Sequence, residues 1–196
     1  MKQSICLTGV VLALASSAAH ATFIVDTGHV AVGGTTKADA YASEFIVDDT
    51  VTISLLQAFM LTGGSGFLEG AFATFAIYSD AGDVPGVKLY SEQVELHAED
   101  SWQGVTDAAW TLQPGSYWIA LETNNPGDTA EFFFGIALGF TPLENNGLIK
   151  DSETWMPTDE GYAWRIGTVV PLPGALLLMM SGLAGLGPVR RKREGR

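Results

Sequence analysis

Val51–Leu61, with the sequence VTISLLQAFML, is the stretch that decides the fold class. It begins with a regular alternation, because Val51, Ile53 and Leu55 are apolar and are separated by hydroxyl residues. A period of two is typical of a strand that buries one of its faces. No stretch of the body, residues 22–169, keeps a period of 3.6 for three turns, so we expect strands there and no long helix.

The sequence around this strand consists of short β-branched and aromatic runs separated by Gly, Pro, Asn and Asp. In Ser116–Glu122 (SYWIALE), Tyr117 and Trp118 fall on opposite faces, so one of them points outward or towards a second layer. The other expected strands are Tyr41–Val47, Gly70–Tyr78, Lys88–Leu96, Ala109–Leu112, Glu131–Phe140 and Ala163–Ile166. Seven to nine strands of this kind predict an all-β fold, a single antiparallel β-sandwich of jelly-roll-like type.

The body of the protein is strongly acidic. The whole chain has 196 residues, 47% of them hydrophobic, and a formal net charge of −12. Between Thr22 and Thr168, four basic residues stand against 21 carboxylates, which is a net charge of −17. Such a surface repels phosphate backbones, so we exclude nucleic acid as a partner.

The first 21 residues have the three parts of a signal peptide. Lys2 supplies the positive start, and Ile5–Ala15 is an apolar run that is too short to span a bilayer. Ala19 and Ala21 occupy the small-residue positions before a cut, so we expect signal peptidase to cleave between Ala21 and Thr22. The single cysteine of the chain lies in this segment, so the mature protein has no thiol for a disulfide, a nucleophile or a metal.

The C-terminal segment, residues 170–196, carries the most specific signal. Leu172–Val189 has no charged residue and has about the length of one membrane span. A basic cluster follows at once, and the positive-inside tendency keeps such a cluster in the cytoplasm. We therefore expect one C-terminal transmembrane helix, with the body outside. The basic cluster consists of Arg190, Arg191, Lys192 and Arg193.

This segment closely resembles the PEP-CTERM sorting domain of exported bacterial proteins. The resemblance rests on a Val-Pro-x-Pro motif, the Gly- and Leu-rich stretch Ser181–Gly187 and the Arg-rich end. The motif consists of Val170, Pro171, Leu172 and Pro173, and Leu172 stands where the family most often has Glu. The resemblance implies a substrate of an exosortase, a membrane enzyme thought to cleave such tails near the motif, in a Gram-negative host that makes extracellular polysaccharide. The alternative is a plain single-pass anchor that is never cut.

Two further segments resemble the choice-of-anchor-type β-sandwich domains of bacterial surface proteins. In Ile77–Tyr90 a Tyr-Ser-Asp turn is followed by Pro85-Gly86, and in Leu112–Leu121 Pro114-Gly115 precedes a Tyr-Trp pair. Pro-Gly pairs favour turns, because proline presets one backbone angle and glycine accepts a positive φ. This resemblance implies a β-sandwich body, and it carries no defined biochemical activity.

The sequence contains no catalytic motif. The mature chain has two histidines, His29 and His97, and no Gly-x-Ser-x-Gly elbow, so neither a nucleophilic triad nor a zinc site is indicated. A glycosidase needs two suitably spaced carboxylates, but pairs at that spacing arise by chance among 21 acidic residues. We therefore predict a non-enzymatic protein, and a two-carboxylate glycoside hydrolase is the least favoured alternative.

Two kinds of ligand remain as candidates. No cofactor is certain, but Asp- and Asn-rich loops supply the oxygen ligands that Ca²⁺ prefers, and ordinary turn residues are the alternative interpretation. The candidate calcium ligands are Asp80, Asp83, Asn124 and Asp128. Tryptophans in or beside loops are candidates for stacking on sugar rings, and buried core aromatics are the alternative. The candidate sugar-stacking residues are Trp102, Trp110 and Trp155.

The chain is thus expected to have three parts: a signal peptide (1–21), an exported β-sandwich domain (22–169) and a sorting and anchor segment (170–196). The predicted function is that of an exported cell-surface or extracellular-matrix protein. Its C-terminal helix is expected to hold it in the inner membrane transiently, before it reaches the cell surface or the extracellular space. Its expected partners are signal peptidase, an exosortase-type enzyme and extracellular polysaccharide. The main alternative is a lectin-like, carbohydrate-binding module, with or without a dependence on calcium.

Overall fold

A computed structural model describes residues 20–29, 38–61, 69–129, 135–136, 147–151, 153–158 and 161–170. Within these ranges the chain forms eleven strands and no helix, and Ala21–Val169 form one compact unit. The strands are β1 (His20–Asp26), β2 (Ala40–Val47), β3 (Val51–Leu61), β4 (Phe72–Asp80), β5 (Pro85–Glu95), β6 (Ser101–Leu112), β7 (Gly115–Glu122), β8 (Gly135–Ile136), β9 (Leu148–Asp151), β10 (Thr154–Pro157) and β11 (Trp164–Val170). Among the described residues no helix could cross a membrane, and the expected span Leu172–Val189 lies outside them.

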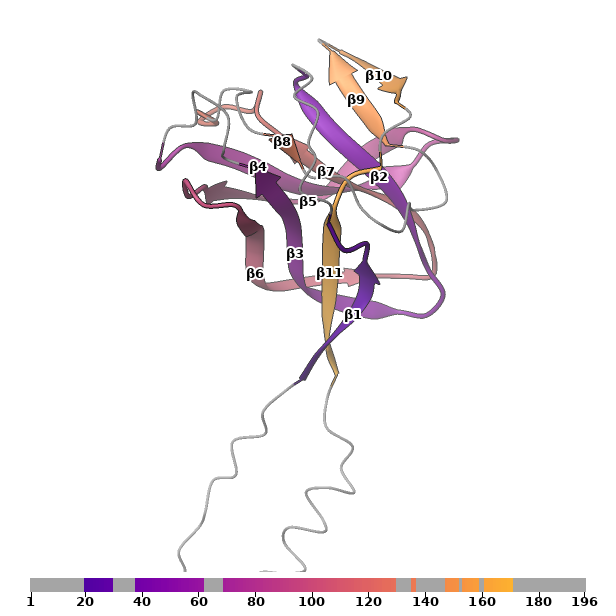
Figure 1. Ribbon diagram of the computed structural model, residues 1–196. Helices are drawn as coiled ribbons and strands as arrows, with labels where there is room; N and C mark the ends of the chain where they lie inside the picture. The colour runs from indigo at the N-terminus through magenta and orange to yellow at the C-terminus, as the bar shows by residue number, and fades with distance from the viewer. Residues whose placement is uncertain are drawn as a thin grey trace, which may run out of the picture. The chain divides into compact units, whose positions relative to one another are not determined.

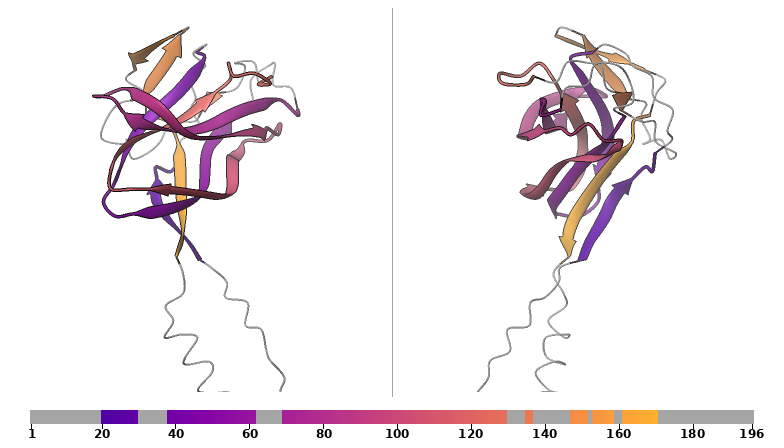
Figure 2. Two further views of the ribbon diagram at one scale, coloured as in Figure 1. Left: turned by 180° about the vertical axis from the view of Figure 1, so that it is seen from behind. Right: turned by 60° about the vertical axis from the view of Figure 1, so that its left-hand side comes forward.

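The strands make two antiparallel sheets (Figures 1 and 2). The first sheet has the order β1-β11-β3-β6, with β8 paired to β3, and the second has the order β10-β9-β2-β7-β4-β5. From β1 to β4, consecutive strands belong alternately to the first and the second sheet. β5 stays in the second sheet, β6 lies in the first, and β7 lies in the second again. The prediction of an all-β domain with antiparallel sheets arranged as a sandwich is therefore confirmed.

The main core lies between the two sheets. Its buried side chains come from both, so each sheet covers the apolar face of the other. Trp164 of β11 is fully buried, and its indole Nε1 donates a hydrogen bond of 2.9 Å to Ser43 Oγ of β2. This bond satisfies the polar end of a large buried aromatic residue and links the two sheets. The largest core residues are Trp164, Tyr41, Phe75, Ile53, Leu56, Met60, Ile77, Leu96, Leu112 and Ile119.

The alternation in β3 does not continue through the strand. The register between β3 and β6 shifts between Ile53 and Leu55, which marks a β-bulge or a similar irregularity. Beyond the shift Leu56 is fully buried, whereas Leu55 is only partly buried and lies beside Gly167 of β11. The expectation that Leu55 continues the buried face is wrong, because an irregularity in register changes which residues face the core.

The turn between β4 and β5 also differs from the prediction. Pro85 and Gly86 begin β5, and the turn itself precedes them, where the Ala81 N–H donates to the Val84 carbonyl over 3.0 Å. Asp83 adopts a φ of 64° in this turn, a conformation that Asp tolerates better than most residues. Strands β1, β9 and β10 have no counterpart among the predicted strands, and β6 begins eight residues before the predicted Ala109.

Gly104 in β6 occupies a position that only glycine fits. Its φ is +152°, and a Cβ atom there would lie 2.1 Å from the Leu56 carbonyl oxygen of β3. Gly104→Ala should lower the free energy of unfolding by about 1–3 kcal/mol more than Gly82→Ala does. Gly82 is the matched control, because it also has a positive φ, +81°, but a Cβ atom there would have no neighbour within 4 Å. Urea denaturation measures both losses, and equal losses would contradict the close approach of β6 to β3.

Candidate functional site

The outer face of the second sheet carries an unusual group of buried side chains. Ile119 and Leu121 of β7 point into the main core, so Trp118 and Glu122 of the same strand point outward. Both are nevertheless buried, Trp118 to 1% exposure and Glu122 to 2%. The sequence-based expectation that one of Tyr117 and Trp118 faces a second layer is confirmed, and the residue is Trp118.

The β9–β10 hairpin supplies part of that second layer. Trp155 of β10 and Tyr78 of β4 are four strands apart in the sheet order, which in a flat sheet is about 19 Å. Their ring centroids are only 6.3 Å apart, so the sheet curls and brings Trp155 over its outer face. Ala42 and Ala120 lie in the same cluster, and their small side chains leave room for the two rings.

The Glu122 carboxylate is the centre of a polar network on this face. Lys88 Nζ lies 2.6 Å from Glu122 Oε2, the Tyr78 hydroxyl donates to Oε1, and the Asn125 amide donates to Oε2. Lys88 Nζ also donates to Asn125 Oδ1 over 3.1 Å. Three donors thus satisfy the oxygens of this buried carboxylate, and burial of such a polar group is tolerated only with partners of this kind. Both oxygens of Glu122 are therefore already occupied by donors from the protein.

The Tyr78 hydroxyl responds to the same environment. Burial raises the pKa of Tyr78 well above its usual value, and the hydrogen bond to the Glu122 carboxylate raises the pKa further. The neutral phenol is the form that donates to a carboxylate, so deprotonation would place two negative charges side by side.

We expect this tyrosine to make the protein less stable in alkali. Above about pH 10 the unfolded chain loses the Tyr78 proton while the folded chain keeps it, so the free energy of unfolding falls as the pH rises. Tyr78→Phe should make the decline between pH 9 and 11 shallower, by less than about 1.4 kcal/mol per pH unit because the hydroxyl is only partly buried. Tyr117→Phe is the control, because the Tyr117 hydroxyl donates to the Gln113 carbonyl over 2.8 Å and not to a carboxylate among the described residues. Identical slopes for the wild type and Tyr78→Phe would contradict the assignment.

The candidate calcium ligands do not meet at one site. Asp80, at the end of β4, accepts hydrogen bonds from Trp118 Nε1 (3.0 Å) and from the Gly82 N–H (3.1 Å). The bond from Trp118 is the main reason why the pKa of Asp80 is lowered. Asp128 instead accepts a bond from Thr74, six residues before Asp80 on β4 and so roughly 20 Å away along the strand.

Asp128 is occupied by protein donors on both of its oxygens. Thr74 Oγ1 and Gln93 Nε2 donate to Oδ1 over 2.8 and 2.9 Å, and the Asn125 N–H donates to Oδ2 over 3.0 Å. Asp83 lies in the turn after β4, and Asn124 lies in the loop that contains Asp128. Within the described ranges no three His, Cys, Asp or Glu side chains are grouped as a metal site would require.

The three candidate sugar-stacking tryptophans also lie apart. Trp155 belongs to the cluster on the second sheet. Trp110 stacks on Tyr90, with ring centroids 5.6 Å apart and planes at 7°, and packs against the main core. Trp102 lies in a separate cluster with Phe59, and the Arg165 guanidinium lies 4.0 Å from its ring centroid. The structure therefore offers no single platform built from all three.

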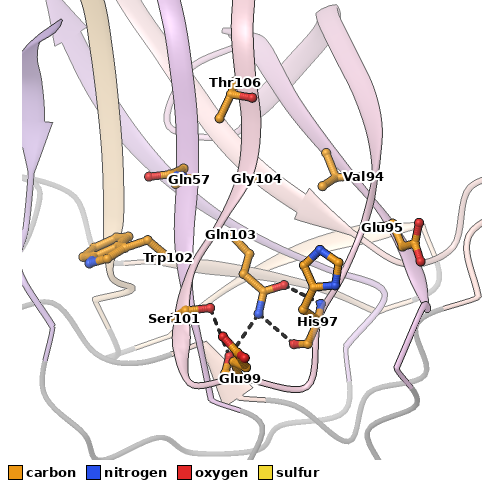
Figure 3. Close-up of a pocket in the computed structure, with 10 residues that line it drawn as sticks. All are labelled: Gln57, Val94, Glu95, His97, Glu99, Ser101, Trp102, Gln103, Gly104 and Thr106. Carbon is orange, nitrogen blue, oxygen red and sulfur yellow. Dashed lines mark hydrogen bonds between the residues drawn. The ribbon is translucent and has the colours of Figure 1, made fainter.

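A polar hollow lies where β5 and β6, the edge strands of the two sheets, are joined (Figure 3). Its volume is about 270 Å³. The lining includes an amide, hydroxyls, carboxylates and one indole, which together can donate and accept hydrogen bonds in several directions. The polar lining side chains, which also include an imidazole and a second amide, are those of Gln57, Glu95, His97, Glu99, Ser101, Trp102, Gln103 and Thr106.

The loop beside this hollow is held in place by Gln103, which is 7% exposed. Its Oε1 accepts from the His97 N–H (2.7 Å), and its Nε2 donates to the carbonyls of His97 (2.8 Å) and Glu99 (3.0 Å). Glu69 accepts from the Ala98 N–H (2.5 Å) and lies 3.2 Å from His97 Nδ1, and the bond from Ala98 is the main reason why the pKa of Glu69 is lowered. Sequence reasoning missed this site, because nothing in the local pattern connects Glu69, His97 and Gln103.

The processing residues are only partly within the described chain. Ala21 and Thr22 lie in β1, and Val170 is the last residue of β11. Ala19, the rest of the sorting motif and the basic cluster lie outside the described residues. No protein-family model matches the chain, and no curated protein matches it significantly. Its function is therefore proposed from its own residues and geometry.

Proposed function

We propose that this chain is an exported, non-enzymatic protein of the cell surface or extracellular matrix, sorted by a PEP-CTERM-like C-terminal segment. The observation that carries the proposal is the uncharged span Leu172–Val189, placed between the Val-Pro-Leu-Pro motif and the basic cluster Arg190–Arg193. The signal-peptide pattern of residues 1–21 supports export. In this proposal signal peptidase removes the first segment, the span halts in the inner membrane, and an exosortase-type enzyme cuts near the motif.

The expected cuts lie at the ends of β1 and β11, and the N-terminal cut would remove His20 and Ala21 from β1. β1 and β11 are neighbours, and they run antiparallel, with bonds from the Thr27 N–H to the Trp164 carbonyl (3.1 Å) and from Thr168 Oγ1 to the Thr22 carbonyl (3.3 Å). The expected N-terminal cut and the start of the sorting motif therefore lie at the same end of the first sheet. A cut after Val170 would remove no residue of the described strands.

We also infer that the body is of the jelly-roll type. Eight strands form two four-stranded sets, β1-β11-β3-β6 and β2-β7-β4-β5, and the chain moves between them as two interlocked Greek keys require. The non-enzymatic part of the proposal is supported by Glu122, the buried carboxylate at the centre of the polar network, because protein donors already occupy its oxygens.

Intact mass of the protein from its native host tests this proposal. We expect a species that begins at Thr22 and ends between Val170 and Pro173, recovered from the medium or the outer envelope. A species that begins at Thr22 but retains Arg196, found only in the inner membrane, would show a plain anchor and contradict sorting by cleavage. A species that still begins at Met1 would contradict export itself.

A second candidate function is carbohydrate binding. The polar hollow between β5 and β6 favours it, because amide, hydroxyl and carboxylate groups with one indole suit a polyhydroxylated ligand. The dispersed positions of Asp80 and Asp128 do not favour a calcium-dependent form of this function.

A further inference from the structure

We propose that the hollow at the β5–β6 edge is a binding site for one unit of an uncharged sugar chain. The inference deepens the second candidate function, and it does not require that the C-terminal segment be cut. It rests on how the hollow is formed, on the groups that line it, on their charge and on the rigidity of the loop beside it.

At Gly104 of β6 the wall of the hollow consists of backbone alone. Trp102, Gly104 and Thr106 alternate along the strand and therefore share one face. Gly104 leaves a gap between the two larger residues, and Gln57 of β3 is its partner across the sheet. The close approach of Gly104 to the Leu56 carbonyl prevents a larger residue from filling the gap.

The size and the lining of the hollow suit a small polyhydroxylated molecule. Its volume of about 270 Å³ lies just below the range of roughly 300–1,000 Å³ typical of pockets for drug-sized ligands. Each sugar hydroxyl can both donate and accept a hydrogen bond. The Gln57 amide and the Thr106 and Ser101 hydroxyls can do the same, while the carboxylates of Glu95 and Glu99 accept.

The charge of the hollow selects against anionic ligands. Glu95 and Glu99 line it together with His97, whose Nδ1 lies 3.2 Å from a third carboxylate, that of Glu69. A uronate or a phosphorylated sugar would meet like charges here, on a body that is already strongly acidic. A metal-bridged ligand is not indicated, because the described part of the chain has no group of three suitable metal ligands. An uncharged sugar remains as the ligand class that fits.

The loop that forms one wall is held by hydrogen bonds to two side chains of the protein. The Gln103 side chain makes three hydrogen bonds to the loop backbone, at His97 and Glu99. The Glu69 carboxylate contacts the same loop at the Ala98 N–H and at His97 Nδ1. Because these contacts hold the loop, binding would not incur the cost of ordering it. Weak ligands such as single sugar units need such preorganisation.

Binding to the purified full-length chain tests the inference, in a detergent without a sugar headgroup. The probes are maltotriose, cellotriose and trigalacturonate, with tryptophan fluorescence and equilibrium dialysis as readouts. We expect at least one neutral trisaccharide to bind saturably and trigalacturonate to bind at least tenfold more weakly. Thr106→Phe, which fills the hollow, should abolish binding, and Gln57→Ala should weaken it at least tenfold.

Thr111→Phe is the matched control, because Thr111 is also exposed on β6 but lies outside the hollow. Its binding should equal that of the wild type. The inference is overturned if neither neutral probe binds, if trigalacturonate binds more tightly, or if Thr106→Phe binds as the wild type does. Processing is measured separately by mass, so failure here and failure of the sorting proposal are distinguishable.

Discussion

A chain that ends at Ala163 should not fold, whereas a chain that ends at Val170 should keep a cooperative unfolding transition. The first truncation removes β11, which lies between β1 and β3 in the first sheet. It removes the fully buried Trp164 and Ile166 from the core and leaves β1 without its neighbour. Losing one large core side chain typically costs about 2–5 kcal/mol, while a whole domain has only about 5–15 kcal/mol of stability.

Circular dichroism melts and limited proteolysis of the two truncated chains measure this difference. The chain that ends at Val170 is the control, because it lacks the same C-terminal segment and retains every described strand. A cooperative transition in the shorter chain would show that β11 is dispensable. Trp164→Phe should give an intermediate loss, since it keeps most of the apolar contact but removes the bond to Ser43.

Lys88→Met should lower the free energy of unfolding by about 3 kcal/mol, the lower end of the cost of breaking a buried ion pair. The loss is large because Glu122 is buried and its carboxylate would remain without a cation. It stays at the lower end because the Lys88 side chain is 32% exposed and the donors from Tyr78 and Asn125 remain.

Denaturant unfolding at neutral pH measures the effect, with Lys150→Met as the matched control. Lys150 lies on the same face with its ammonium 5.9 Å from the Trp155 ring, so the same substitution there should cost about 1 kcal/mol or less. In Lys88→Met/Glu122→Gln the carboxylate charge is also removed, and the total loss should be smaller than that of Lys88→Met alone. Equal losses at the two lysines would refute the ion pair as the cause.

The fold class could be predicted from the sequence, but the neighbours of the candidate site residues could not. Trp118 could be placed in a second layer, because the period of a strand assigns every other side chain to the same face. Its neighbours could not be named, since Trp155 comes from a hairpin 37 residues later that reaches it only because the sheet curls. The four proposed calcium ligands were chosen as turn residues, and a turn composition does not state which turns lie together.

The sequence by itself determined that this protein has an all-β body, where its main strands run and that the body is strongly acidic, because local periodicity and charge are properties of the chain alone. Tertiary structure decided the rest. Because of the register shift in β3, Leu56 and not Leu55 lies in the core. β11 lies between β1 and β3 in the first sheet. The Glu122 network and the hollow beside Gly104 both join residues from different strands, so only the pairing of distant segments could create them.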